Sequence, residues 1–280
     1  MAKHTAAFSS AAGLVVDNSS NAYRAAIELH DQEETSAGVI KVVEGKAWDP
    51  DQSAPLISPE GLQTRLQVLE GLKSYAQSLS DVTSGLDSPA LTAAATSTGA
   101  NLKSLGTTIA SDPVGSKTGI SVGTQTANIV STAALALGEY LVSRKVKAAL
   151  PSITRQMDPQ IESLCKLLTD DVGRLRRQSN VDYEGLFNQE WAFIQANRDK
   201  LTPVELRAEV EKLPAIRKSE HSNDAMLADL VTAIGRLALT HHALAAAAQG
   251  NNPEALSARI ADLEAAGKNL GDFYQGLATK

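Results

Sequence analysis

Apolar and small side chains recur along this chain at alternating intervals of three and four residues, which is the period of an α-helix. The first such stripe starts at Phe8, passes through Leu29 and ends near Ile40. It predicts a helix over residues 5–38, about 50 Å long at a rise of 1.5 Å per residue. Only Val39 to Val43 has the composition of a strand, and this segment is too short and isolated to form a sheet.

Seven of the ten prolines directly follow Ser, Thr, Asp or Asn, and such a pair is typical of a helix start. The side-chain oxygen accepts a hydrogen bond from a backbone N–H that has no partner within the helix. Proline has no N–H, and at the first position of a helix that N–H would have no partner within the helix either. Asp49-Pro50 and Asp112-Pro113 lie in Gly- or Pro-rich surroundings and are candidates for turns instead. The pairs that precede apolar stripes and predict helix starts are Ser58-Pro59, Ser88-Pro89, Asp158-Pro159, Thr202-Pro203 and Asn252-Pro253.

Other local signals predict where helices end or begin. Residues 44–57 are rich in Gly and Pro and predict a connecting loop, in which Trp48 is expected to cover one end of the core. Pro151 predicts a helix end, because proline disfavours helical backbone at the residue before it. Pro214 predicts a kink or a break. Thr202-Pro203-Val204-Glu205 has the spacing of a capping box.

These patterns predict an all-α fold, an elongated antiparallel bundle of about 6–9 helices, some of them long. The chain is 43% hydrophobic but only 4% aromatic, and a core of small side chains suits closely packed helices. We expect residues 1–280 to form a single helical-bundle domain, with a subdivision near residue 151 as the alternative.

Charge and cysteine content exclude several classes of function. The formal net charge is −6 and no sizeable basic face is predicted, so nucleic acid is not an expected partner. Cys165 is the only cysteine, which rules out an intramolecular disulfide and a Cys-based zinc site, and its apolar neighbours predict a buried thiol.

The histidines do not predict a metal site. They lack the Glu-x-x-His spacing of di-iron bundles. His241 and His242 are adjacent and therefore point about 100° apart on a helix, which prevents chelation by the pair. His30 stands next to several acidic residues and is expected on a solvated face. The sequence therefore predicts no metal, no cofactor and no catalytic residue.

The middle of the chain contains two imperfect enzyme motifs. Gly119, Ser121 and Gly123 match the G-x-S-x-G pattern of serine hydrolases, but that motif needs a strand before the serine and none is predicted. Gly115-Ser116-Lys117-Thr118 resembles the end of a phosphate-binding loop but lacks the glycine directly before lysine. A serine hydrolase is therefore only a distant alternative.

The same segment contains small residues at four-residue spacing, which on a helix form a smooth ridge that another backbone can approach. The segment 115–142 could then be a membrane-active or pore-forming-like helix, although its polar side chains make it a poor membrane span. Tight packing inside a soluble bundle is the favoured interpretation. The ridge residues are Gly115, Gly119, Gly123 and Ala127.

Three arginines follow two aspartates later in the chain. Arg174, Arg176 and Arg177 are candidates for contact with an acidic partner. The alternative is an exposed basic end of a helix, where positive charge complements the helix dipole.

The first ten residues, from Met1 to Ser10, resemble the mature start of a bacterial lipoprotein in which the acylated cysteine is replaced by methionine. Weaker similarity to uncharacterised bacterial lipoproteins extends along the N-terminal third. The resemblance implies a lipid tether and a periplasmic or outer-membrane location, with a cytoplasmic protein as the alternative. It implies no activity.

The leading hypothesis from the sequence is a non-enzymatic, extracytoplasmic helical-bundle protein that acts through protein–protein interaction, with an unidentified protein partner. A membrane-active helical protein that uses residues 115–142 is the second hypothesis.

Overall fold

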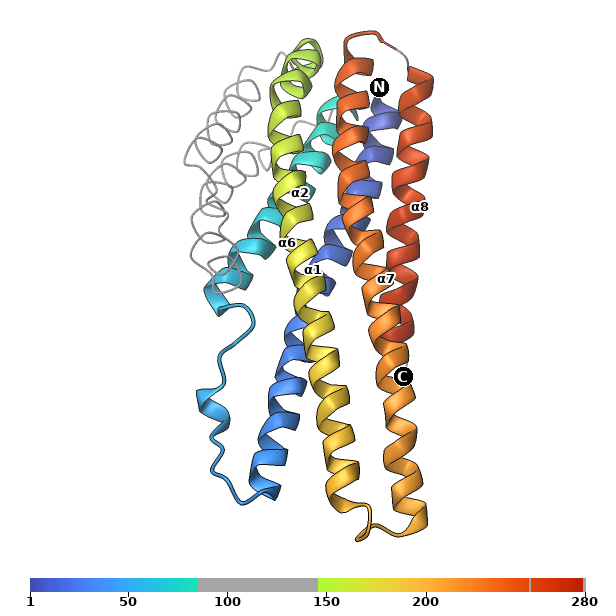
Figure 1. Cartoon of the computed structure of the whole chain (residues 1–280). Helices are drawn as coiled ribbons and strands as arrows, with labels where there is room; N and C mark the ends of the chain where they lie inside the picture. Colours follow the sequence, from blue (N-terminus) through green and yellow to red (C-terminus); the bar gives the residue numbers. More distant parts are fainter. Residues whose placement is uncertain (85–145, 252, 279–280) are drawn as a thin grey trace. The chain divides into compact units, whose positions relative to one another are not determined.

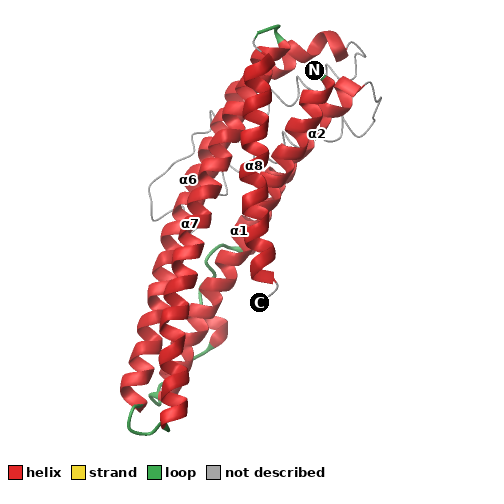
Figure 2. Cartoon of the chain, turned by 90° about the vertical axis from the view of Figure 1, so that its right-hand side faces the viewer, coloured by secondary structure: helices red, strands yellow, loops and turns green. Residues whose placement is uncertain are grey.

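A computed structural model of the chain describes residues 1–84, 146–251 and 253–278, and the regular structure in this part is entirely helical (Figures 1 and 2). The all-α prediction is therefore confirmed. The described residues hold five α-helices, fewer than the 6–9 predicted, and the predicted helix after Ser88-Pro89 lies outside them. The elements are α1 Ala2–Val43, the short 3-10 helix η1 Pro50–Gln52, α2 Pro59–Ser84, α6 Val146–Asn197, α7 Pro203–Ala248 and α8 Pro253–Ala278.

Three predicted helix starts are confirmed. The Ser58 hydroxyl accepts a hydrogen bond from the Gly61 N–H at 3.0 Å and caps α2. The capping box before α7 is complete, because the Thr202 N–H donates to the Glu205 carboxylate at 2.8 Å and the Glu205 N–H donates back to the Thr202 hydroxyl at 3.3 Å. The last helix begins at Pro253. Asp49-Pro50 opens only the short η1, as its surroundings suggest.

Two predictions based on proline are wrong. The chain neither ends a helix at Pro151 nor begins one at Asp158-Pro159, because α6 continues through both prolines. Apolar side chains on either side of them, including Leu150, Met157 and Ile161, are buried, and their burial outweighs the lost backbone hydrogen bonds.

Two further segments also differ from expectation. Pro214 lies inside α7, so the helix does not break there, and the alternative of a kink stays a prediction. Val39–Val43, which has the composition of a strand, is the last turn of α1.

The chain forms two compact units, and each combines segments from before and after residue 151. Unit 1 consists of Met1–Asn21, Ile57–Asp171 and Asp229–Lys280, and unit 2 of Ala22–Leu56 and Val172–Ala228.

In unit 1 the order of contacts gives the helix directions. Thr5 contacts Thr83, and Asp17 forms an ion pair with Lys73, so α1 and α2 are antiparallel. His4 contacts Ser257 at 3.0 Å, and the Asn18 side-chain amide donates to the carbonyl oxygen of residue 267 at 2.9 Å, so α1 and α8 are parallel.

Gly267 allows α8 to approach α1 closely. A Cβ atom at this position would lie 2.7 Å from the Cβ of Leu14, closer than side chains can pack. The absence of a side chain therefore lets the two backbones meet.

One charged pair is buried in unit 1. Arg65 on α2 and Asp171 on α6 are 1% and 4% exposed, and the guanidinium donates to both carboxylate oxygens, at 2.7 and 3.1 Å. Arg65 also donates to the Gly61 carbonyl at 3.1 Å. Burial removes both charges from water, which costs free energy of hydration. The two hydrogen bonds between the guanidinium and the carboxylate offset that cost.

In unit 2, α1 runs parallel to α6, because His30 contacts Asp182 and Glu33 contacts Gln189. The α6 and α7 segments are antiparallel, which is fixed by the ion pairs Arg176–Asp224 and Glu184–Arg217. The apolar core lies between these three segments and includes Tyr23, Leu29, Leu175, Leu186 and Leu227.

Trp48 packs against α1 within unit 2. A Cβ atom at Gly38 would lie 2.0 Å from Cε2 of the Trp48 ring, so only glycine leaves room for the indole. The residue predicted to cover an end of the core therefore covers the last turns of α1.

Among the described helices, α7 is long and apolar enough to cross a membrane by length and composition alone. Half of its most apolar window is buried, and its side chains Leu230, Ile234, Leu237 and Leu244 belong to the core of unit 1. A buried core helix accounts for this composition equally well.

Arg65→Met is expected to destabilise the protein by about 3–5 kcal/mol, because the Asp171 carboxylate would stay buried without its guanidinium. Urea unfolding followed by circular dichroism measures the loss. The control Lys73→Met breaks an exposed ion pair with Asp17 and should cost at most about 1 kcal/mol. Equal losses in the two variants would contradict a dominant role for the buried pair.

Gly38→Ala is expected to displace the Trp48 ring and to shift its fluorescence emission to longer wavelength, because the new methyl group occupies the position of the indole. The measurement is made in a Trp191→Phe background, so that Trp48 is the only tryptophan. The matched control is Gly235→Ala in α7, where a Cβ atom meets nothing within 4 Å. That change should leave the emission unaltered and stabilise the helix by about 1 kcal/mol.

Candidate functional site

Several residues predicted from the sequence lie outside the described part of the chain. They include the small-residue ridge Gly115, Gly119, Gly123 and Ala127, and the serine of the hydrolase-like motif, Ser121. Tight packing, membrane activity and hydrolysis by this segment stay predictions.

The three candidate arginines do not form one exposed basic patch. Arg174 is buried, Arg177 is exposed, and Arg176 donates two hydrogen bonds of 2.6 Å to the Asp224 carboxylate. They also lie well inside α6, which continues to Asn197, so the alternative of a basic helix end is wrong. A role in partner contact stays a prediction for Arg177, the exposed member.

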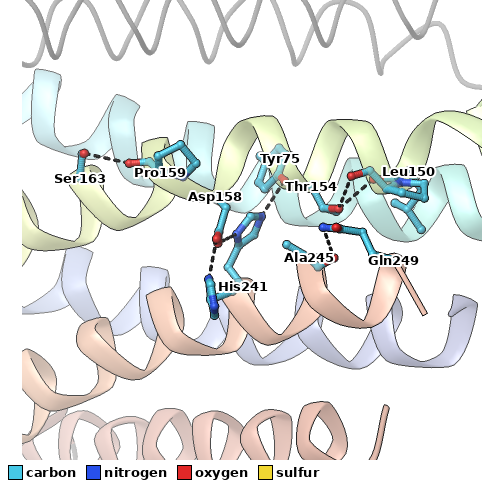
Figure 3. A network of polar contacts seen from close by, with 11 residues as sticks. Tyr75, Leu150, Thr154, Asp158, Pro159, Ser163, His241, Ala245 and Gln249 are labelled. Atoms are coloured by element: carbon cyan, nitrogen blue, oxygen red, sulfur yellow. Dashed lines mark hydrogen bonds and ion pairs between the residues drawn. The ribbon is translucent and has the colours of Figure 1, made fainter. Parts of the chain in front are cut away.

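The most developed polar arrangement in unit 1 joins three helices. Tyr75 comes from α2, Asp158 from α6, and His241 and His242 from α7. Figure 3 shows the His241 ring between Asp158 and Tyr75, with its Nδ1 3.0 Å from a carboxylate oxygen and its Nε2 2.8 Å from the phenol oxygen. The other carboxylate oxygen lies 2.6 Å from Nδ1 of His242.

These partners fix how the protons are arranged. The Asp158 carboxylate only accepts, so Nδ1 of His241 carries a proton and its N–H donates a hydrogen bond to that carboxylate. Nε2 of the neutral ring then accepts the hydrogen bond from the Tyr75 hydroxyl. Each polar atom of the buried phenol and imidazole therefore has a partner.

The surroundings shift the pKa of each group. Burial lowers the pKa of His241, against the opposing effect of Asp158. Burial also acts to raise the pKa of Asp158, but the hydrogen bonds from His241 and His242 outweigh it and hold that pKa below its usual value. Burial raises the pKa of Tyr75 far above its usual value. At neutral pH the network is therefore a neutral phenol, a neutral buried imidazole and a carboxylate.

The network extends from the core to the surface. Tyr75 and His241 are buried and Phe8 packs beside the His241 ring, with ring centroids 6.0 Å apart, whereas the His242 side chain is 75% exposed. A reactant in solution could reach His242 but not the phenol or the inner imidazole. The arrangement thus satisfies buried polar groups and fixes the register of α2, α6 and α7.

Sequence reasoning missed this network for two reasons. The Asp158-Pro159 pair predicts a helix cap, but Asp158 lies inside α6 and its side chain contacts two histidines. Adjacent histidines on a helix do not chelate one metal ion. Each of them can nevertheless contact a different oxygen of the same carboxylate, as His241 and His242 do with Asp158. The sequence does contain a signal for the network, because His241 occupies a position in the apolar stripe Ile234, Leu237 and Leu244. An imidazole at such a buried position needs a hydrogen-bond partner, which predicts a polar side chain on a neighbouring helix.

His30 is the second histidine that differs from expectation. The sequence predicts it on a solvated face, but its side chain is only 14% exposed and contacts Asp182 at 3.2 Å and the Ala54 carbonyl at 3.3 Å. Burial acts to lower the pKa of His30, but Asp182 outweighs it and raises that pKa above its usual value.

The described residues contain no group of three or more His, Cys, Asp or Glu side chains that could hold a metal ion. Cys165 is buried, as predicted, and burial raises the pKa of its thiol to about 12. A thiol of that pKa is unreactive at neutral pH.

His241→Gln is expected to flatten the pH dependence of stability between pH 7 and pH 5. Because folding lowers the pKa of His241 from its ordinary 6.5, the unfolded chain takes up this proton more readily. The stability that neutral His241 contributes is therefore present above pH 6.5 and is lost as the pH falls. Urea unfolding at several pH values measures the slope.

The matched control is His242→Gln, which removes the exposed imidazole but keeps the buried one. It should retain the slope of the wild-type protein over this range. An unchanged slope in His241→Gln would show that the buried imidazole does not titrate with unfolding.

No protein-family model matches the sequence, and neither a curated protein nor a solved structure matches it. The predicted resemblance to lipoproteins thus stays untested. The function must follow from the residues and geometry of this chain itself.

Proposed function

We propose that this protein acts by binding another protein through one end of unit 2, without catalysis. The surface, here called the apolar end, lies where α1 and α6 end and α7 begins, segments that Figures 1 and 2 both place together. It consists of the exposed side chains Val39, Val42, Val43, Trp191, Val204 and Val210.

The distribution of exposed apolar side chains carries the proposal. Of the nine large hydrophobic residues that are exposed in the described chain, seven belong to unit 2, and six of these form the apolar end. Val204 is 79% exposed and Trp191 48%. Single exposed apolar residues are ordinary, but a group at one end of a helical unit is typical of a protein-binding surface, and tryptophan is frequent among residues that dominate binding energy.

The first half of α7 also supports an external partner. From Pro203 to Ala225 the helix buries only Leu213, whereas from Met226 onward it contributes many core residues. This half relies on surface ion pairs such as Arg207–Glu211 and Arg217–Glu220, which stabilise a helix only weakly. A helix that buries so few side chains within its own chain would gain stability by packing against another protein.

The polar surroundings fit a protein interface. Acidic and basic side chains alternate around the apolar end, as in Glu205, Arg207, Glu209 and Lys212. Mixed charge around an apolar centre is typical of protein–protein contacts. An extracytoplasmic location, supported only by the lipoprotein-like first residues, belongs to the same proposal.

A photo-crosslinking amino acid at Val204 is expected to give a discrete protein adduct in cells of the native host, because this position lies in the proposed surface. The matched control places the same amino acid at Glu254, which is exposed on α8 in unit 1. Trp191→Ser should weaken the interaction about tenfold or more, since exposed tryptophans often dominate binding.

Denaturing gel electrophoresis and mass spectrometry identify the adduct. The same adducts from both positions, or no adduct from Val204, would contradict the proposal. Circular dichroism of Trp191→Ser separates a lost contact from a lost fold.

A further inference from the structure

Three charged side chains meet between α6 and α7 beside the apolar end. Glu190 comes from α6, and Glu209 and Lys212 from the facing stretch of α7. The Lys212 ammonium forms a close ion pair with Glu209 and lies 3.7 Å from Oε1 of Glu190. We call this group the carboxyl clasp. Its exposed neighbours in sequence, Trp191 and Val210, belong to the apolar end.

The clasp has two carboxyl groups and one cation, and the cation, the Lys212 ammonium, lies closer to Glu209 than to Glu190. The Glu190 side chain is 19% exposed, and its Oε1 atom is buried with no hydrogen-bond partner among the described residues. A carboxylate oxygen in that position loses its hydration, and the Lys212 ammonium at 3.7 Å offsets only part of that cost. Protonation of Glu190 relieves this cost and supplies an O–H that can donate to the Glu209 carboxylate.

The shifts in pKa agree with this geometry. Burial, together with the Glu209 carboxylate, raises the pKa of Glu190 to about 7, against the opposing effect of Lys212. Lys212 lowers the pKa of Glu209. The other elements of unit 2 are α1 and η1, and the α1 carboxylate that reaches toward this part of α6 is Glu33, which accepts a hydrogen bond from the Gln189 side chain.

We propose that the carboxyl clasp is a proton-operated device that holds α6 and α7 together when Glu190 is protonated and lets this end of unit 2 open when Glu190 ionises. Ionisation places two carboxylates beside a single ammonium, and their repulsion favours separation of the helices. Opening exposes apolar residues that are buried on these stretches of α6 and α7, such as Ile194 and Leu213. The added apolar area strengthens partner binding at higher pH, a consequence that rests on the function proposed above.

The sign of the pH dependence follows from linkage. Glu190 has an ordinary pKa of 4.5, and folding raises it, so the closed state binds the proton more tightly than the open state. The opening equilibrium therefore increases as the pH rises from 4.5 to about 7 and is constant above that range.

Hydrogen exchange of the free protein tests the clasp without any partner. Protection factors of amides in residues 188–197 and 203–215, corrected for intrinsic exchange, should fall between pH 5 and pH 7 by up to about tenfold per pH unit. Glu190→Gln keeps a side-chain N–H for Glu209 but does not titrate, so protection should be high and independent of pH. Lys212→Met should move the midpoint to higher pH.

The matched control is Glu211→Gln, one residue from the clasp in an exposed ion pair with Arg207. It should show the wild-type profile. Wild-type protection factors that do not vary with pH, or that vary equally in Glu190→Gln, would overturn the proposal. A carbon-13 titration of the Glu190 carboxyl group with a midpoint below pH 5 would also overturn it.

Crosslinking from Val204 then tests regulation separately. Adduct yield that rises from pH 5 to pH 7 in the wild type and stays constant in Glu190→Gln supports control of binding by the clasp. An equal rise in both proteins overturns that control. Since exchange is measured without a partner, failure of the protein-binding function leaves the exchange result intact and is recognised by the absence of any adduct.

Discussion

The Asp158 carboxylate holds unit 1 together in a way that apolar packing alone could not. Its two oxygens bind adjacent histidines of α7, and the inner histidine extends the chain of hydrogen bonds to Tyr75 on α2. Apolar side chains of similar size can slide past one another along a helix face, but hydrogen bonds of defined length cannot. The network therefore selects one register of α2, α6 and α7 from the several that a core rich in Ala and Leu would accept.

The two units differ in how their helices are held. Unit 1 combines an extensive apolar core with two fully partnered polar groups, the Asp158 network and the Arg65–Asp171 pair. In unit 2 the stretch of α7 before Met226 has little core and many surface ion pairs. Stability in proteins is distributed unevenly, and segments that bind partners are drawn from the less stable part. The apolar end and the carboxyl clasp both include residues of this stretch of α7.

The sequence predicted the helical elements well where the signal was local. Thr202 and Glu205 cap α7 as expected, because a capping box involves only neighbouring residues. Asp158-Pro159 carries the same local signal and was misassigned, since the partners of Asp158 are 83 and 84 residues away. The clasp was equally hidden, because nothing in the sequence places Glu190 beside Glu209. Local propensity thus predicts helices, and the candidate site depends on tertiary contacts between distant segments.

The topology of unit 1 also constrains how the protein can form during synthesis. His4 and Ser257 are 253 residues apart in sequence but in contact, so α1 cannot pack against α8 until the residues of α8 have left the ribosome. The contacts between α6 and α7 in unit 2 need only a short connection and can form much earlier, as in the pair Glu184–Arg217, 33 residues apart. During that interval the apolar face of α1 has no α8 to cover it, and a nascent chain in this state would depend on chaperones to avoid aggregation.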